Sequence, residues 1–220
     1  MHGEQIRLRI WASFWRKIAL SLVLGSGVWT AYLLIQRHPV FPVTAMNPTW
    51  MDRAIPFVPS SVYMYESIWL LMPIGPWLMK SKEELNRYIN GLLLITLAAF
   101  AVFIFHPTMV PRPKGIHGLG GLYELLIRVD RELNAFPSLH AAFAVFHGAC
   151  CHAVFSDLRW SRVTRWFVWA WVFGIIASTL LTRQHVVADA VAGVAVGFAG
   201  YALFRYWPLA RDLRKETVPA

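Results

Sequence analysis

Mostly apolar residues occur in six stretches of the chain, each long enough to cross a membrane as a helix. A hydrocarbon core of roughly 30 Å requires about 20 mostly apolar residues in helical form. The first stretch contains a run from Ile18 to Ile35 without a charged side chain, which is too long for the apolar core of a signal peptide. We therefore predict six membrane spans, at about residues 15–36, 61–79, 90–106, 139–155, 166–182 and 186–206.

The second predicted span is the least regular of the six. It contains Glu66, and Pro73, Gly75 and Pro76 interrupt its second half. Such breaks are tolerated in membranes where neighbouring helices satisfy the freed backbone groups. An acidic residue inside a span usually has a partner or a role, and the sequence identifies neither for Glu66.

The composition agrees with a membrane protein, because 57% of the 220 residues are hydrophobic and only 15% are charged. Cys150 and Cys151 are adjacent within the fourth predicted span, where neighbouring side chains point apart. We therefore interpret them as packing residues rather than as a disulfide framework. The fold class that we predict is an all-α integral membrane bundle of six helices, formed by a single domain over residues 1–220.

Basic residues give the chain a formal net charge of +9, and their positions indicate topology rather than nucleic-acid binding. They lie at helix ends and form no basic face interleaved with aromatic residues. With a cytoplasmic N-terminus, 14 of the 21 basic residues fall on the cytoplasmic side, as the positive-inside tendency favours. We therefore expect an integral protein of a bacterial inner membrane with both termini in the cytoplasm. The other seven cations would face the periplasm or the exterior: Arg37, Arg53, Arg112, Lys114, Arg128, Arg131 and Arg183.

The loop of residues 107–137 is long enough to carry function, and it leads into the first polar motif. Pro137 disfavours helix at the residue before it, and Ser138 is a good N-cap for the span that follows. The free N–H groups and the positive dipole end of that helix form an anion site. His140 lies in the first turn, so the motif places a histidine beside this anion site.

A second polar motif opens the sixth predicted span, at residues 182–189. His185 and Asp189 are four apart and share a helix face, where the carboxylate can accept the imidazole N–H. This contact fixes the tautomer and leaves the lone pair of the other nitrogen available for attack. Asp189 lies about one turn into a membrane helix, where an ionisable group is costly and usually marks function. In the predicted topology both motifs face outward, so we predict a two-histidine centre on that side.

These residues resemble the motifs of the type 2 phosphatidic acid phosphatase superfamily, whose membrane members have six spans. The second family motif is P-S-G-H, which residues 137–140 match with Leu139 in place of glycine. The third motif is S-R, five residues, H, three residues and D, and it is matched at Ser178, His185 and Asp189. The resemblance covers the chain from about the second span onward.

Three departures from the family motifs bear on the reaction. The first motif is K, six residues, R-P, and Arg112 with the following proline matches its end, while Phe105 occupies the lysine position. Thr179 occupies the arginine position of the third motif, so two family cations are missing. Leu139, the Ser-Thr start of the third motif and Arg183 before the histidine are similar to the inositol phosphorylceramide synthase branch.

The resemblance implies a phosphoryl-transfer enzyme that requires neither a metal nor another cofactor. His185 would attack phosphorus and form a phosphohistidine, Asp189 would orient it, and His140 would protonate the departing oxygen. The implied phosphate ligands are Arg112, Ser138 and Arg183. Additional candidates for the site are Lys114, Ser178, Thr179 and His147. The predicted catalytic motifs therefore lie in residues 107–140 and 178–189.

Structural roles compete with these functional interpretations. His147 follows His140 by seven residues and shares its helix face, where it could line the floor of the site. A lone histidine in an apolar helix more often packs in a core, and this applies to His147 and to His152. Residues 128–132 alternate basic and acidic side chains, which is typical of a solvated or headgroup-facing helix end, and a role toward the substrate headgroup is the second interpretation.

The sixth predicted span also carries a stripe of small residues. Gly193, Gly197 and Gly200 recur at intervals of four and three. This spacing favours close packing of the span against a neighbouring helix.

The leading functional prediction is a phosphatase that acts on a membrane lipid phosphate or diphosphate from the outer side. The nearest alternative is a phospholipid headgroup transferase like inositol phosphorylceramide synthase, in which an alcohol replaces water as the acceptor. A transporter or proton relay is a third possibility, and it would use His140, His185, Asp189 and Glu66. Three of these four residues lie near one membrane face rather than at graded depths, and no inverted repeat is visible, so the sequence argues against it. A soluble haloperoxidase of the same superfamily does not fit a membrane chain.

Overall fold

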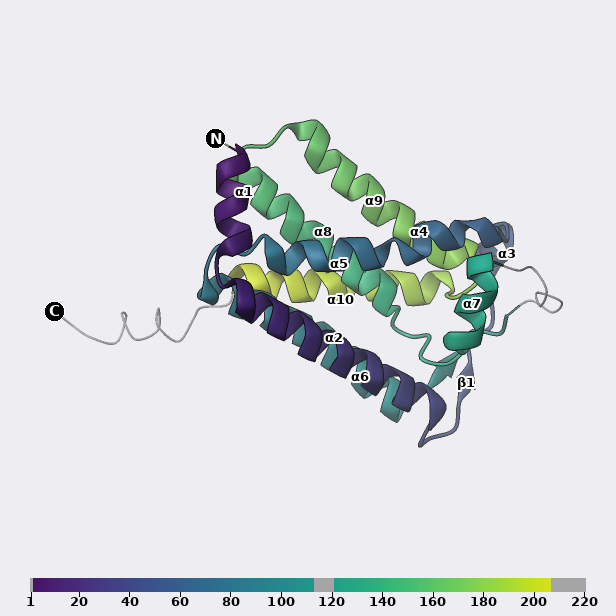
Figure 1. Ribbon diagram of the computed structural model, residues 1–220. Coiled ribbons are helices and arrows are strands. Elements are labelled where there is room, and N and C mark those ends of the chain that lie inside the picture. Colours follow the sequence, from purple (N-terminus) through teal and green to yellow (C-terminus); the bar gives the residue numbers. More distant parts are fainter. Residues whose placement is uncertain (1, 113–120, 207–220) are drawn as a thin grey trace.

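The computed structural model describes residues 2–112 and 121–206, and they form a bundle of helices (Figure 1). The N-terminal half contains α1 (His2–Trp11), α2 (Phe14–Arg37), β1 (Thr44–Ala45), α3 (Trp50–Ala54), η1 (Pro59–Ser61), α4 (Val62–Glu66), α5 (Ile68–Trp77) and α6 (Lys82–Phe105). The C-terminal half contains β2 (Thr108–Met109), α7 (Gly121–Val129), α8 (Leu139–Asp157), α9 (Arg162–Leu181) and α10 (Val187–Tyr206).

Within the described residues, five helices are long and apolar enough to cross a membrane: α2, α6, α8, α9 and α10. The prediction of an all-α membrane protein is therefore confirmed. The region predicted as the second span instead consists of η1, α4 and α5, and the break between α4 and α5 falls at Ser67. Pro73 and Pro76 lie within α5 rather than at the break. Neither α4 nor α5 is among the helices long enough to cross a membrane, so the count of six spans stays a prediction.

The sequence pattern did not predict α1, which precedes the first spanning helix and is joined to it by a tight turn. Ser13 in that turn has a φ of 56°. The side chain of Lys17 is buried and its Nζ donates to the carbonyl oxygens of Arg9, Trp77 and Met79, at 2.6, 3.2 and 2.8 Å. The last carbonyl groups of a helix lack partners inside it, and Lys17 supplies one for α5. This basic residue therefore ties α1, α2 and α5 together.

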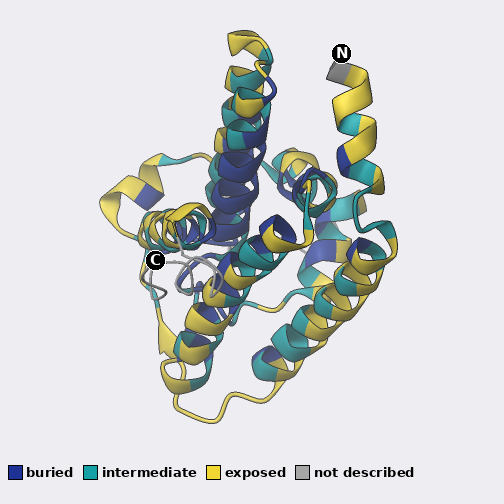
Figure 2. Ribbon diagram, turned by 90° about the vertical axis from the view of Figure 1, so that its left-hand side faces the viewer, coloured by how far each residue is buried: buried dark blue, intermediate teal, exposed yellow. Residues whose placement is uncertain are grey.

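The α8 helix is the centre of the bundle, since most of its apolar stretch is buried while the other four spanning helices bury a third or less. Figure 2 shows buried residues gathered on the inward helix surfaces and exposed residues on the outer ones. The α10 helix packs closely on α8, because an added Cβ at Gly193 would lie 2.3 Å from the Ser138 carbonyl oxygen. At Gly197 it would lie 2.5 Å from the carbonyl oxygen of Ala142. The predicted close packing of this glycine stripe is confirmed.

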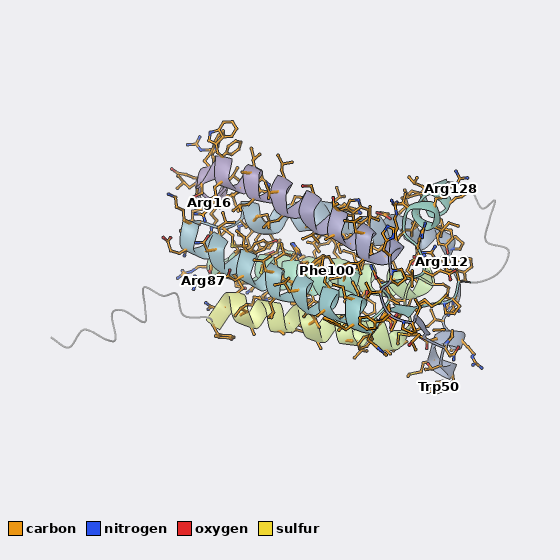
Figure 3. The ribbon with its side chains drawn as sticks, turned by 90° about the horizontal axis from the view of Figure 1, so that it is seen from below. Arg16, Trp50, Arg87, Phe100, Arg112 and Arg128 are labelled. Carbon is orange, nitrogen blue, oxygen red and sulfur yellow. The ribbon has the colours of Figure 1, made fainter. Side chains whose placement is uncertain are left out.

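The two ends of the bundle differ. The α1 helix and the last turn of α10 lie at one end, where Figure 3 shows Arg16 and Arg87. The short elements α3 and α7 lie at the other end, together with Arg112 and Arg128 (Figures 1 and 3). At that end β1 pairs in parallel with β2, which joins the connection after α2 to the connection after α6. Both polar motifs of the sequence open helices at this second end.

Candidate active site

The first motif forms the N-terminus of α8 as the sequence predicts. Ser138 caps the helix, and its Oγ accepts a hydrogen bond of 3.3 Å from the backbone N–H of Ala141. The segment before it is fixed by a hydrogen bond from the Phe136 N–H to Thr108 Oγ1, at 2.9 Å. His140 is the second residue of α8, so a buried cap and a neighbouring strand set the position of its backbone.

The second motif forms a turn between α9 and α10. The backbone N–H groups of Gln184 and His185 both donate to the carbonyl oxygen of Thr179, at 3.1 and 3.2 Å. His185 Nδ1 lies 3.3 Å from Asp189 Oδ2, and the same oxygen accepts the Val186 N–H at 3.1 Å. Asp189 is completely buried. The predicted contact between the histidine and the carboxylate is therefore present.

A carboxylate from a distant part of the chain holds the start of α10. Asp52 of α3 accepts the Val187 N–H on Oδ1 at 2.7 Å, and its other oxygen accepts from the Thr49 N–H and hydroxyl. Burial acts to raise the pKa of Asp52, but these hydrogen bonds outweigh it and lower the pKa below the usual value. Sequence reasoning missed this residue, because its partner lies 135 positions away.

The tertiary structure brings the two motifs together. The Ser138 N–H donates to the Asp189 carbonyl oxygen at 3.1 Å, which joins the start of α8 to that of α10. His140 and His185 both line one cavity. The imidazole of His140 stacks on the ring of Tyr65 with centroids 3.8 Å apart, and its Nδ1 lies 3.1 Å from the Tyr65 hydroxyl.

The cavity that contains both histidines has a volume of about 380 Å³ and extends among α2, α4, α5, α6, α7 and α8. Its walls are mostly apolar away from the histidines, with contributions from Leu24, Val28, Met72, Leu92, Leu125 and Phe143. It is therefore a polar site that continues into an apolar space inside the bundle.

Arg112 lies beside the second motif. Its Nη2 donates to Gln184 Oε1 at 2.6 Å and to the Asp130 carbonyl oxygen at 2.8 Å. Its Nη1 donates to the Ile127 carbonyl oxygen at 3.3 Å. Its Nε is buried and has no hydrogen-bond partner within the described parts of the chain. This arginine is therefore held next to the residue that precedes His185, with one donor unused.

The other predicted cations lie elsewhere. The guanidinium of Arg183 donates to the backbone carbonyl oxygens of Asp52 and Ile55, and Arg183 itself has a φ of 56°. Its side chain thus stabilises the connection that carries Asp52, and a phosphate contact for Arg183 stays a prediction. Lys114 lies outside the described residues.

Three further candidates use their polar atoms within their own helices. The Ser178 hydroxyl donates to the carbonyl oxygen of Ile175 at 2.6 Å, and the Thr179 hydroxyl donates to that of Ile176 at 2.7 Å. His147 is buried, and its Nδ1 lies 2.7 Å from the Phe143 carbonyl oxygen. These contacts agree with the packing alternative for His147.

Asp130, which the sequence assigned first to a solvated or headgroup-facing helix end, lies in the wall of the cavity, and a role toward a substrate headgroup stays a prediction. Its Oδ1 accepts from the Tyr32 hydroxyl at 2.8 Å and from Gln36 Nε2 at 2.6 Å. Burial raises the pKa of the Asp130 carboxyl, although these hydrogen bonds favour its ionised form. Arg128, in contrast, is exposed and pairs with Glu124 of its own helix. No pattern within residues 128–132 distinguishes the two environments.

The described residues contain no group of three or more histidine, cysteine, aspartate or glutamate side chains that could hold a metal ion. A family model described as the PAP2 superfamily matches residues 30–203. The chain belongs to the PAP2 superfamily. This match includes both polar motifs and the elements that form the cavity from α4 to α8, together with the last part of α2. Searches among curated proteins and among solved structures found no significant match.

Membership in the PAP2 superfamily identifies the general type of protein. The chain is an integral membrane enzyme of the phosphatase or phosphotransferase type, and its apolar helices agree with a lipid substrate in a bilayer. The resemblance to this superfamily that the sequence motifs indicated is therefore confirmed, while its inositol phosphorylceramide synthase branch stays a prediction.

Proposed function

We propose that this PAP2 protein is a lipid phosphate or diphosphate phosphatase that works through a phosphohistidine on His185. The observation that supports this proposal most strongly is that His140 and His185 lie at the end of a mostly apolar cavity. The phosphate group would meet the two histidines while the hydrocarbon chain extends between the helices. A soluble phosphate ester would leave the apolar walls without a partner.

In the first step, Nε2 of His185 attacks phosphorus. The Nδ1–H of the ring donates to Asp189 Oδ2, which keeps the lone pair on Nε2 and stabilises the positive charge that forms on the ring. A bond between phosphorus and nitrogen forms as the bond between phosphorus and the lipid oxygen breaks. His140 gives a proton to that departing oxygen, so the lipid leaves as an alcohol, or as a monophosphate when the substrate is a diphosphate.

In the second step, water attacks the phosphohistidine. His140 now accepts a proton from the water, a new bond between phosphorus and oxygen forms, and the bond to His185 breaks. Inorganic phosphate leaves, and both histidines return to their starting state. The mechanism uses the chain's own residues for each proton transfer.

Charge on the phosphoryl oxygens requires donors at the same end of the cavity. The first turn of α8 has N–H groups without partners inside the helix, and the Ser138 cap occupies the N–H of Ala141, so the amides of Leu139 and His140 would bind the anion. Arg112 would contribute through Nε, which has no hydrogen-bond partner among the residues that the structure describes. Arg183 can take part only if it exchanges its bonds to the carbonyl oxygens of Asp52 and Ile55.

The proposed membrane arrangement has six spans, with α4 and α5 together forming the second. The end of the bundle with Arg16 and Arg87 would face the cytoplasm together with both termini, as the distribution of basic residues favours. The two histidines would then face the periplasm or the exterior of a bacterial inner membrane. Substrate would enter from the outer leaflet.

The test is release of inorganic phosphate from phosphatidic acid or a polyprenyl diphosphate by detergent-purified protein without added metal. His185→Ala is expected to reduce release to background. His106→Ala is a matched control, because His106 is an exposed histidine at the same end, and it should retain activity. Phosphate release that persists in His185→Ala would overturn the mechanism.

The same preparation decides between water and an alcohol as acceptor. The protein is incubated with phosphatidic acid labelled in its phosphate and with a lipid alcohol. Labelled inorganic phosphate in the aqueous phase supports the proposed hydrolysis. A labelled phosphate ester of the added lipid alcohol would contradict it and favour transfer.

A further inference from the structure

The two histidines of the cavity have different partners on their Nδ1 atoms. His185 faces the carboxylate of Asp189, whereas His140 faces the hydroxyl of Tyr65. Tyr65 comes from α4, which lies at the same end of the bundle as α7 and α3 (Figure 1). Tyr65 is 1% exposed, so this contact is built into the interior.

Tyr65 restrains the imidazole of His140 in two ways. The two rings are stacked, with centroids 3.8 Å apart and an interplanar angle of 19°, which fixes the plane of the imidazole. The hydroxyl lies 3.1 Å from Nδ1, which occupies that nitrogen. His140 Nε2 is buried and has no hydrogen-bond partner in residues 2–112 and 121–206. Because His140 lines the cavity, Nε2 is the nitrogen left for a substrate.

The difference in partners matters for the chemistry. A carboxylate stabilises an imidazole that gains positive charge, as His185 does when it bonds to phosphorus. A neutral phenol accepts an N–H bond without adding a negative charge, so an imidazolium beside it gives up its proton more readily. A pair of titratable groups in contrasting environments is the arrangement that separates an acid from a nucleophile.

We propose that Tyr65 is a positioning residue that assigns His140 the role of proton donor, by holding Nδ1 and leaving Nε2 to exchange protons with the substrate. In the protonated ring, Nδ1–H donates to the Tyr65 hydroxyl and Nε2–H points to the departing oxygen. After Nε2 has passed its proton to that oxygen, Nδ1 keeps its own proton and Nε2 is ready to accept one from water. This inference rests on the proposed function.

The test compares two variants of Tyr65 on two kinds of substrate. Tyr65→Phe keeps the stacked ring and removes the hydroxyl, and Tyr65→Leu removes both. An alkyl lipid phosphate has a departing oxygen that needs a proton, whereas the nitrophenolate released from p-nitrophenyl phosphate does not. We expect Tyr65→Phe to lower kcat/KM for the alkyl phosphate by about 10- to 100-fold, a part of the factor that general acid catalysis contributes, with little change for the aryl phosphate. The comparison uses kcat/KM because it reports the first step alone, whereas kcat also contains the second step, in which His140 accepts a proton from water with either substrate. Tyr65→Leu should cause a larger loss with the same selectivity.

The pH profile supplies a second measurement that needs only the lipid substrate. Without an acceptor for Nδ1–H, the His140 imidazolium loses its proton more easily, so the alkaline limb of kcat/KM should move to lower pH in Tyr65→Phe. Tyr63→Phe is the matched control, because Tyr63 lies on the same helix and is 67% exposed, and it should match the wild type.

Equal losses on both substrates, or an unshifted alkaline limb in a variant that unfolds at the wild-type temperature, would overturn the role of Tyr65. The reference variants keep this result separate from the proposed function. His140→Ala should reproduce the selective loss of kcat/KM, and His185→Ala should abolish turnover of both substrates. Activity that persists in His185→Ala would contradict the phosphohistidine mechanism itself, whatever Tyr65 does.

Discussion

The backbone N–H of Ser138 donates a 3.1 Å hydrogen bond to the backbone carbonyl oxygen of Asp189. This bond joins the start of α8 to the first turn of α10; His140 lies in the first turn of α8, and His185 lies two residues before α10. The contact is possible because Gly193, one turn further along α10, lets the two backbones approach closely. The geometry of the candidate site therefore depends on how closely two helices pack.

Gly193→Ala should separate these helices. The added Cβ would lie 2.3 Å from the Ser138 carbonyl oxygen, so a backbone must shift. We expect a loss of stability of about 1–3 kcal/mol, the usual cost of overpacking, and a marked fall in kcat. Thermal unfolding in detergent and phosphate release measure the two effects. Gly27→Ala is the control, because nothing lies within 4 Å of its added Cβ. If both variants unfold and react like the wild type, Gly193 is not needed for the close approach of the two helices.

Asp189→Asn should retain the fold and lose the chemistry. Oδ2 of Asp189 serves both the Val186 N–H and His185 Nδ1. An amide that keeps its oxygen at this position lacks the negative charge that stabilises the imidazole, and one that turns its NH₂ group there favours the tautomer with the wrong nitrogen protonated. By analogy with the orienting carboxylate of a catalytic triad, kcat should fall about 10³- to 10⁴-fold. Labelling with radioactive substrate should show no trapped phosphohistidine. A variant with kcat within a few-fold of wild type would show that the carboxylate does not orient the nucleophile.

Asp52→Ala should loosen the start of α10. It removes the acceptor of the Val187 N–H, which acts as a helix cap supplied from a distant segment, and such caps contribute about 1–2 kcal/mol. Asp157→Ala removes an exposed acid at the opposite end of the bundle and serves as the control. Equal unfolding temperatures for the two variants would refute the capping role.

The contribution of Asp52 should also depend on pH. Its pKa in the folded protein is lowered, so its stabilising effect is complete above the ordinary value of about 4 and is lost as the pH falls through the folded value. The difference in unfolding temperature between the wild type and Asp52→Ala should therefore be constant near neutrality and shrink in acid. A difference that grows in acid would contradict this assignment.

Gly25→Phe should shorten the lipid chain that the cavity accepts. Gly25 lines the cavity and has nothing within 4 Å of an added Cβ, so a larger side chain can project into that space. Loss of room for two methylene groups corresponds to about a tenfold fall in kcat/KM for long-chain substrates. Short-chain substrates should be unaffected. Gly27→Phe is the matched control, because Gly27 lies on the same helix but outside the cavity lining. If both variants show the same dependence of kcat/KM on lipid chain length, the hydrocarbon chain of the substrate does not occupy this cavity.

Local sequence patterns were sufficient for most of the fold. The five long helices follow from uninterrupted apolar stretches, since helix formation in a membrane depends on length and hydropathy within one segment. The pattern failed in two places for physical reasons. It placed the interruption of the second span at the prolines, whereas the chain breaks at Ser67. It also missed α1, a short polar helix held where Arg9 donates to the Leu78 carbonyl oxygen just after α5 and where Lys17 of α2 donates to the Arg9 carbonyl oxygen.

The sequence by itself determined the parts of the candidate site that lie within one helical turn of each other. The Ser138 cap and the contact of His185 with Asp189 are of this kind, because they join residues three and four positions apart at the start of a helix. Only the tertiary structure decided which residues meet across the bundle. Tyr65 reaches His140 from 75 positions away, and Asp52 reaches Val187 from 135, by contacts that depend on how α3 and α4 pack against α8 and α10. Spacing along the chain carries no information about such pairs, so the partner that distinguishes one histidine from the other was visible only once the helices were packed.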